Sequence, residues 1–217
     1  MADEEPRFLE ARQSICDYGR RLIEDELTTG TGGNLSVRLG EDRIAISPSG
    51  IPYEQMSASD VPVVTLDGTV VTGSGDPSSE LPMHLAVYDD RPDVAGVVHT
   101  HSPYATTFAS LAEPIPASHY LLAFAGTEVP VAEYETHATR DLGATVVEAL
   151  GESSRAALME NHGVLTAADS LEFAYTVAQM VEFCARIHYQ ARAIGEPEIL
   201  PADEIERVRG KLESYVE

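Results

Sequence analysis

The stretch Val-Ala-Gly-Val-Val-His-Thr-His-Ser-Pro, residues 94–103, decides the fold prediction, because a β-branched run there leads directly into a helix start. Val94–His99 favours a strand, since branched apolar side chains fit a pleated, half-buried surface. Pro103 suits the first turn of a helix that we expect to continue to about residue 111. His99 and His101 are alternate residues, so an extended chain presents them on one face, about 7 Å apart. The stretch therefore predicts a buried strand that ends in two imidazoles.

Short strands dominate the chain before this stretch, and helices dominate it afterwards. We expect strands at Asn34–Arg38, Arg43–Ser47, Pro62–Leu66 and Thr69–Thr72, near Glu128–Ala132 and near Ala156–Glu160. We expect helices at residues 6–27, 79–89, Ala138–Leu150, Leu171–Ile194 and Pro201–Tyr215. Hairpin-length connections in the first third favour an α/β fold with a mixed, mostly antiparallel sheet over a doubly wound parallel one. The 217 residues contain no internal repeat, so we expect a single domain over residues 1–217.

The charge balance argues against several classes of partner. The chain has 36 acidic and 14 basic residues and a formal net charge of −22, which disfavours a nucleic acid or an anionic membrane as a ligand. No apolar run approaches the roughly 20 residues that cross a bilayer. The first residues, MADEEPRF, lack the basic and apolar segments of a secretory signal. We therefore expect a soluble, cytoplasmic protein.

Lysine is nearly absent from the chain: Lys211 is the sole lysine among the 14 basic residues. An acidic, lysine-poor surface stays hydrated in concentrated salt, so we hypothesise a halophilic source, with an ordinary acidic cytosolic protein as the alternative.

Catalysis through a lysine Schiff base needs an amine in a desolvated pocket, and Lys211 stands in a polar stretch. Cys16 and Cys184 have no CxxC or CxxH neighbours and are expected to be buried thiols. Schiff-base chemistry and a cysteine-based zinc site are therefore disfavoured.

A third histidine extends the metal hypothesis. His162 follows an apolar run in the sequence Glu-Asn-His-Gly, residues 160–163, where the glycine permits a sharp turn beside the ring. Three neutral imidazoles would leave a metal ion its full charge and an open position, as in catalytic zinc sites. A lone histidine is more often a hydrogen-bonded core or surface residue, so the spacing of His99 and His101 carries this prediction. The remaining histidines lack such spacing and are expected to be non-ligands: His84, His119, His137 and His188.

Three donor-rich turns could bind an anion. They lie at residues 30–36, 47–50 and 76–80, and the last stands at an expected helix start, where N–H groups and the helix dipole favour negative charge. None has the context of a P-loop or a dinucleotide-binding motif. On sequence grounds Glu80 is first interpreted as a capping acid. The alternative is a carboxylate near the metal that removes a proton from a carbon next to a carbonyl.

Several motifs, in the same order, resemble those of the class II aldolase/adducin family, particularly of its members that cleave L-fuculose 1-phosphate. The motifs are GTGGNLSVR (30–38), SPSGIPYEQM (47–56), GDPSSELPMHLAVY (75–88), RPDVAGVVHTHSPYATTFA (91–109), PIPASHYLLAFAG (114–126) and MENHGVLT (159–166). This resemblance implies a three-layer αβα domain assembled as a cyclic homotetramer with active sites between subunits.

The resemblance also implies roles for individual residues. It implies a zinc ion held by His99, His101 and His162, with Glu80 touching the metal in the empty site and acting as the base once substrate displaces it. It implies a substrate phosphate site formed by Gly33, Asn34, Ser49, Gly50, Ser78 and Ser79. Tyr120 resembles an acid that a neighbouring subunit supplies, and Tyr215 lies where the family has a tyrosine that closes over the site. His137 replaces an aromatic residue that commonly recognises the aldehyde, which leaves the aldehyde preference open.

The implied activity is that of a metal-dependent aldehyde-lyase. Such an enzyme cleaves a ketose 1-phosphate, L-fuculose 1-phosphate or a related deoxyketose 1-phosphate, to dihydroxyacetone phosphate and an aldehyde such as lactaldehyde, through a metal-stabilised enediolate. Pentulose-phosphate 4-epimerases tend to have aspartate at the position of Glu80 and another near His119, and no aspartate occurs between residues 94 and 140. Methylthioribulose-1-phosphate dehydratase is the stronger enzymatic alternative, since it keeps the glutamate and the histidines. A non-catalytic adducin-like module is disfavoured because all four metal-site residues are present.

Overall fold

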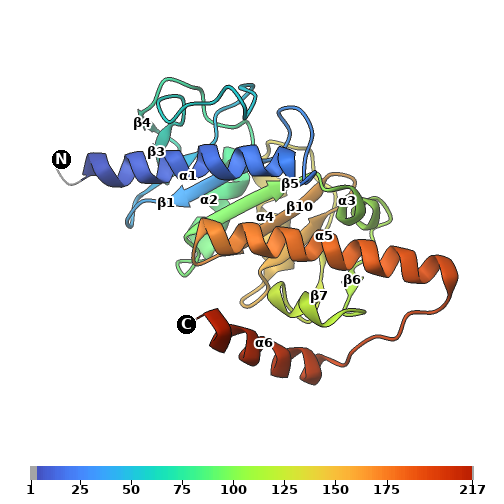
Figure 1. Cartoon of the computed structure of the whole chain (residues 1–217). Helices are drawn as coiled ribbons and strands as arrows, with labels where there is room; N and C mark the ends of the chain where they lie inside the picture. The colour runs from blue at the N-terminus through green and yellow to red at the C-terminus, as the bar shows by residue number, and fades with distance from the viewer. Residues whose placement is uncertain (1–3, 217) are drawn as a thin grey trace.

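The computed structural model describes residues 4–216, which form an eight-stranded sheet with helices on both faces (Figure 1). The strands lie in the order β4-β3-β2-β1-β5-β10-β9-β8. Their bounds are β1 Asn34–Arg38, β2 Arg43–Ile46, β3 Val63–Thr65, β4 Val70–Thr72, β5 Gly96–Thr100, β8 Val131–Ala132, β9 Ala156–Met159 and β10 Gly163–Ala168. Neighbouring strands pair antiparallel, apart from β8 and β9, which pair parallel. The predicted mixed, mostly antiparallel sheet is confirmed.

The helices form a layer on each face of this sheet. They are α1 Glu4–Glu24, α2 Leu81–Asp90, α3 Pro103–Ser110, α4 Arg140–Leu150, α5 Leu171–Ile194 and α6 Ala202–Val216, with a 3₁₀ helix η1 at Tyr120–Phe124. In Figure 1, α1 and α5 cross in front of the sheet, whereas α2 and α4 lie behind it. This arrangement is the predicted three-layer αβα sandwich. Among residues 4–216, no helix has both the length and the apolar character that crossing a membrane requires.

Two segments differ from the sequence prediction. The pattern does not predict β10, because its sequence GVLTAA is rich in alanine and does not alternate apolar with polar side chains. All six residues of β10 are buried, as expected for a strand covered on both faces. The single strand expected near Glu128–Ala132 is two strands, β7 Glu128–Val129 and β8, which belong to different sheets. Pro130 separates them, and β7 pairs instead with β6, Ile115–Pro116.

Alternation places the apolar side chains of Leu35 on β1 and Val98 on β5 on one face, and their polar neighbours on the other. Leu35 and Val98 pack in the apolar cluster beneath α1 and α5. Their neighbours Asn34, Ser36 and His99 point to the opposite face, which α2 covers, because successive side chains of a strand alternate. Asn34 and His99 are also register partners on adjacent strands. The face beneath α2 therefore brings together three polar residues of the two central strands, Asn34, Ser36 and His99.

The two cysteines are buried, as the sequence predicts. Cys16 lies in the cluster beneath α1, and Cys184 lies on α5 in a separate apolar cluster. Burial raises the pKa of the Cys184 thiol to about 12, so this thiol stays protonated at neutral pH. Both cysteines therefore belong to the core.

Candidate metal centre and active site

Three histidines converge where β5 ends. His99 is the fourth residue of β5, His101 follows the strand, and His162 lies in the turn between β9 and β10. The antiparallel register of β10 on β5 sets Leu165 opposite His99, which brings the turn beside the strand end. The ligand atoms of the three imidazoles all lie within 4.8 Å of one another, and the Nε2 atoms of His99 and His101 are 2.9 Å apart. The convergence expected from the H-x-H spacing and the Asn-His-Gly turn is therefore present.

The electronic state of these rings suits a metal ligand. Nδ1 of His99 lies 3.0 Å from the Val164 carbonyl oxygen and donates its proton there, which leaves the lone pair of Nε2 facing the cluster. Burial, together with the neighbouring His99, lowers the pKa of His101 and of His162 to about 4. The imidazoles of His101 and His162 are therefore neutral at neutral pH. Three imidazole groups with ligand atoms at this spacing fit a divalent cation, with zinc as the common choice.

Glu80 completes the cluster from the start of α2. It occupies the N-cap position but makes no side-chain capping hydrogen bond, so the capping interpretation is wrong. Its Oε2 lies 3.2 Å from Nε2 of His99, and its Oε1 lies 3.3 Å from Nε2 of His162. Asn34 donates a hydrogen bond of 2.8 Å to Oε2. Within the described residues Oε1 is buried without a hydrogen-bond partner, and this orphaned oxygen beside three imidazoles also fits a cation.

The pKa of Glu80 follows from these contacts. Burial alone would raise it, but the neighbouring His99, the hydrogen bond from Asn34 and the nearby His162 together hold it below the usual carboxyl range. Its side chain is 9% exposed. Glu80 is therefore a buried carboxylate, ionised at neutral pH, that lies against the metal-binding group.

Glycines around the histidines allow the close packing of the cluster. A Cβ atom on Gly163 would lie 2.4 Å from the Thr100 carbonyl oxygen and 3.0 Å from Cδ2 of His101. A Cβ atom on Gly33 would lie 2.6 Å from the His99 carbonyl oxygen, and Gly33 has a φ of +70°. Both positions therefore need glycine for close approach to the histidine strand.

The donor-rich turns lie next to one another and lead to Glu80. Pro48 and Pro77 form an isolated antiparallel bridge between the turns at residues 47–50 and 76–80. The Ser78 backbone N–H donates to the Ser47 carbonyl oxygen at 3.1 Å, and the Ser78 hydroxyl accepts the Glu80 N–H at 3.2 Å. The predicted phosphate-binding residues Ser49, Gly50 and Ser79 are exposed, whereas Ser78 is 8% exposed. The two turns thus present exposed hydroxyl and N–H groups close to the carboxylate.

Asn34 lies deeper than the other predicted phosphate residues. Its carboxamide donates to Glu80 through Nδ2, while its Oδ1 lies 2.5 Å from Nε2 of His84. The side chain is 4% exposed. In this structure both ends of the carboxamide are therefore engaged with Glu80 and His84, and a contact with phosphate stays a prediction.

Tyr120 lies apart from the cluster. Tyr120 is 48% exposed on η1, which packs against α5 and α6, and within residues 4–216 it has no hydrogen bond or ring contact with the three histidines. Tyr215 lies in α6, among residues 213–216, whose side chains are not described. His137 is exposed and close enough to His162 to contribute to lowering its pKa. This single chain thus unites the histidines, Glu80 and the turns, but not Tyr120.

Sequence reasoning missed two buried residues at this site. His84 is fully buried one helical turn after Glu80, and its partners on β1 are about 50 positions away in the chain, so no local motif reveals them. Thr28 is 3% exposed, and its hydroxyl has no hydrogen-bond partner among the described residues. That hydroxyl lies 2.9 Å from the position of a Cβ on Gly32, so it faces the glycine-rich turn. The spacing Glu-x₃-His-x₃-Tyr at residues 80–88 is the one signal that could have indicated His84.

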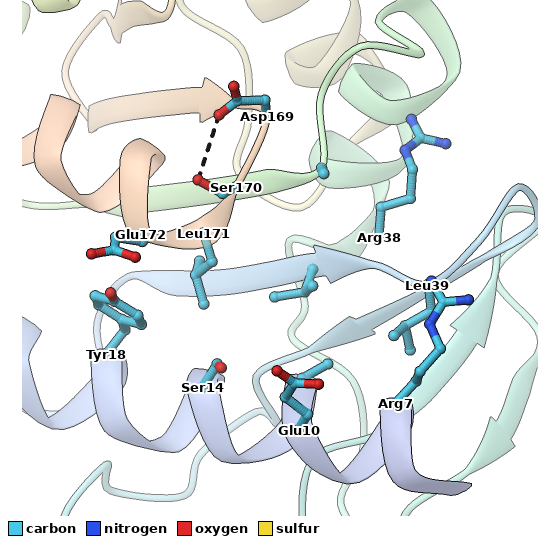
Figure 2. A pocket seen from close by; sticks show the side chains of 13 residues that line it. Arg7, Glu10, Ser14, Tyr18, Arg38, Leu39, Asp169, Ser170, Leu171 and Glu172 are labelled. Carbon is cyan, nitrogen blue, oxygen red and sulfur yellow. Dashed lines mark hydrogen bonds between the residues drawn. The ribbon is translucent and has the colours of Figure 1, made fainter. Parts of the chain in front are cut away.

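A separate cavity lies between α1 and the start of α5 (Figure 2). Its volume is about 420 Å³, and Arg7, Glu10, Arg38 and Glu172 contribute charges of both signs to its wall. In Figure 2 the Ser170 hydroxyl donates a hydrogen bond of 3.4 Å to the Asp169 carboxylate at its edge. The cavity shares no lining residue with the histidine cluster, so we assign it no part in the candidate active site.

The chain belongs to the class II aldolase and adducin N-terminal domain family, whose sequence model matches residues 13–189. Class II aldolases are metal-dependent lyases, in agreement with the three-histidine group. The expected family membership is therefore confirmed.

Among curated relatives, a 5-deoxy-D-ribulose 1-phosphate aldolase of Bacillus thuringiensis is 47% identical over 205 residues, covering 94% of this chain and 96% of the relative. An L-fuculose phosphate aldolase of Escherichia coli is 40% identical over 208 residues, covering 94% of each protein. A 5-methylthioribulose-1-phosphate/5-deoxyribulose-1-phosphate aldolase of Rhodospirillum rubrum is 38% identical over 205 residues, covering 94% of this chain and 91% of the relative.

Solved structures agree with the fold. An L-fuculose 1-phosphate aldolase superimposes with a TM-score of 0.91 at 44% sequence identity, covering 94% of this chain and 96% of that chain. The l-fuculose-1-phosphate aldolase of Thermus thermophilus has a TM-score of 0.75 at 27% identity, covering 86% of this chain and 95% of that chain. The shared architecture extends over nearly the whole chain.

Proposed function

We propose that this protein is a zinc-dependent aldolase that cleaves a deoxyketose 1-phosphate between C3 and C4, giving dihydroxyacetone phosphate and a short aldehyde. The observation that carries the proposal is the meeting of three imidazoles with the buried carboxylate of Glu80, beside two donor-rich turns. This combination suits removal of a proton from carbon next to a carbonyl.

The residues divide into a phosphate end and a reacting end. Hydroxyl, amide and N–H groups of the turns would bind the phosphate. The proposed residues are Gly33, Asn34, Ser49, Gly50, Ser78 and Ser79. These groups are neutral, and at molar salt the Debye length of about 3 Å limits repulsion from the distant acidic surface. A divalent cation held by His99, His101 and His162 would supply electrophilic stabilisation for negative charge that develops on the substrate oxygens.

Glu80 and Tyr120 would move the protons. In the direction of aldol addition, Glu80 removes a proton from the hydroxymethyl carbon of dihydroxyacetone phosphate, and that carbon then bonds to the aldehyde carbon. Tyr120 of a neighbouring subunit protonates the new alkoxide. In cleavage the same transfers run in reverse, and Glu80 returns the proton to C3. No lysine is needed, in agreement with the near absence of lysine from the chain.

The preferred substrate is 5-deoxy-D-ribulose 1-phosphate, with L-fuculose 1-phosphate as the second candidate. The relative named for the first is 47% identical, and the E. coli relative named for the second is 40% identical. Both sugars end in a methyl group, and their cleavage releases acetaldehyde and lactaldehyde, which differ by one hydroxymethylene unit. The exposed His137 beside His162 is the proposed contact for this part of the substrate.

The substrate assignment is tested with purified, zinc-loaded protein. Release of dihydroxyacetone phosphate is measured by coupled NADH oxidation, using 5-deoxyribulose 1-phosphate, L-fuculose 1-phosphate, 5-methylthioribulose 1-phosphate and ribulose 5-phosphate in parallel. We expect the highest kcat/KM for 5-deoxyribulose 1-phosphate. Loss of water from methylthioribulose 1-phosphate would indicate a dehydratase, and C4 inversion of a pentulose phosphate would indicate an epimerase. Absence of bound metal and of any response to added metal would favour a binding module.

We also propose a homotetramer whose active sites combine two chains. The exposed position of Tyr120, away from the histidines of its own chain, supports this arrangement. Tyr215 would close over the site from α6. The test is complementation: E80Q and Y120F should each lose most activity alone, but refolding them together should restore part of it, because mixed assemblies contain sites with both native groups. Activity that stays absent in proven mixed assemblies would contradict shared sites.

A further inference from the structure

Helix α2 and strand β1 present two rows of polar side chains to each other. Glu80, His84 and Tyr88 are four residues apart and therefore lie on one side of the helix, while Asn34 and Ser36 are alternate residues of the strand. Four residues rise about 6 Å along a helix and two residues about 7 Å along a strand, so the side chains of the two rows have nearly the same spacing. The strand residues can thus interleave between successive helix residues.

These five side chains form one continuous series of hydrogen bonds, here called the α2–β1 ladder. From the reacting end, the contacts are Glu80 Oε2 to Asn34 Nδ2 at 2.8 Å, Asn34 Oδ1 to His84 Nε2 at 2.5 Å, His84 Nδ1 to Ser36 Oγ at 2.6 Å, and Ser36 Oγ to Tyr88 OH at 2.9 Å. Each residue is buried, with exposure between 0% for His84 and 7% for Glu80. The ladder therefore lies in a low-dielectric environment, where its bonds are strong.

The chemistry of the groups fixes the direction of every bond. The Glu80 carboxylate can only accept, so the amide nitrogen of Asn34 faces it and Oδ1 faces His84. His84 must then donate from Nε2. Burial lowers the pKa of His84 to about 3, so the ring is neutral and Nδ1 accepts the hydroxyl proton of Ser36. Ser36 in turn accepts from Tyr88. All the donated protons therefore point toward Glu80.

We propose that His84 is a positioning residue: with Ser36 and Tyr88 it holds the Asn34 carboxamide in the one orientation that donates to Glu80, and so holds Glu80 in the orientation that reacts. This inference rests on the function proposed above. Glu80 needs such a support because its own helix position supplies no side-chain bond. Without His84, the amide of Asn34 could rotate and present oxygen to the carboxylate, which repels it.

The test measures the half-reaction that needs Glu80 but no aldehyde: exchange of a carbon-bound proton of dihydroxyacetone phosphate with D₂O, followed by ¹H NMR. We expect H84F to slow exchange about 10–100-fold, the range found for groups that orient active-site ligands, with zinc content and KM within about twofold of the wild type. S36A should show a smaller loss, and Y88F the smallest. H84Q should recover much of the rate, because its amide can donate to Asn34 Oδ1.

Two substitutions elsewhere control for the loss of buried polar groups. His188 is 5% exposed and contacts the Ser118 hydroxyl at 3.0 Å through Nδ1, so H188F removes a similar histidine–serine pair far along the chain from Glu80. Tyr175 is 1% exposed and donates to Asp25 at 2.6 Å, so Y175F matches Y88F. Both controls should lose thermal stability yet keep the exchange rate. Equal loss of exchange in controls and ladder variants would assign the ladder a purely structural role.

A measurement independent of activity completes the test. In a ¹H–¹⁵N spectrum of the imidazoles at pH 7, His84 should be the Nε2–H tautomer, and S36A should weaken that preference. The opposite tautomer, or wild-type exchange in folded S36A and H84F, would overturn the ladder. Absence of exchange in the zinc-loaded wild type would instead refute the proposed aldolase function, while the tautomer still tests the ladder itself.

Discussion

At β1 and β5 one face of the sheet packs in the core and the other carries side chains of the candidate active site, although alternate residues of the same strands form both faces. Leu35 and Val98 face α1 and α5 among apolar side chains. Asn34, Ser36 and His99 face α2 and take part in hydrogen bonds that lead to the carboxylate of Glu80. A step of one residue thus separates packing from chemistry. Substitutions on the α2 face should therefore change turnover, whereas substitutions on the α1–α5 face should change stability.

The largest effect is expected on the α2 face for E80Q, which removes the base and keeps the shape of the side chain. Turnover should fall about 10²–10⁴-fold, the usual contribution of a positioned general base. The three histidines remain, so zinc content measured by elemental analysis should stay at one per chain. E113Q is the control, since it breaks only an exposed ion pair with Arg192. Wild-type turnover in E80Q would remove Glu80 from the proposed chemistry.

The next effect is expected on the opposite face for L35A. Leu35 is fully buried, and truncating such a side chain costs about 2–5 kcal/mol of unfolding free energy. Urea unfolding should reveal this loss, while kcat per folded molecule stays close to the wild type. A fall of kcat as large as that of E80Q, in protein that is still folded, would mean that the two faces are not separable.

Part of this division can be predicted from the sequence and part cannot. The bounds of β1 follow from its local pattern of alternating side chains. The H-x-H spacing at the end of β5 is also a local feature, so residues 94–101 alone predict a strand that ends in two histidines. The position of His162 beside it depends on the pairing of β5 with β10, and the sequence pattern does not predict β10. Glu80 has the local pattern of a helix cap, and only its contacts with His99 and His162 reveal the other role.

His84 illustrates the same limit. It lies outside the three-histidine group, as its spacing predicts, yet it contacts Asn34 and Ser36, residues 50 and 48 positions earlier in the chain. Hydrogen bonds between a helix and a strand that are distant in sequence leave no local pattern beyond a repeat of four on one element and of two on the other. A buried polar network therefore becomes visible only when the packing is known.

The pH dependence of stability should distinguish the faces by about 2 kcal/mol. Burial lowers the pKa of His84 to about 3 in the folded protein, against about 6.5 in the unfolded chain. The stabilisation from neutral His84 is therefore complete above pH 6.5, and the protein loses it as the pH falls toward 3. In metal-free protein, lowering the pH from 6.5 to 5 should cost about 2 kcal/mol from this group. H84Q should reduce the slope measured by urea unfolding, whereas L35A should leave it unchanged. An unchanged slope in H84Q would contradict the burial of a neutral imidazole.

The smallest effect should act on both faces alike, because it arises from the surface. With a formal charge of −22, repulsion among exposed carboxylates opposes folding at low salt, and the Debye length shortens from about 10 Å at 0.1 M to about 3 Å at 1 M. If the chain is adapted to concentrated salt, raising KCl from 0.1 M to 2 M should raise Tm by several degrees.

The stability deficit of L35A and the exchange deficit of S36A should be the same at both salt concentrations, because buried contacts and a buried ladder are scarcely screened. Equal molarities of NaCl and KCl should act alike if screening is the cause. A Tm that does not change between the two concentrations would refute the halophilic hypothesis without affecting the contrast between the faces. A salt-dependent S36A deficit would instead mean that solvent ions reach the α2 face, which the burial of Ser36 and His84 forbids.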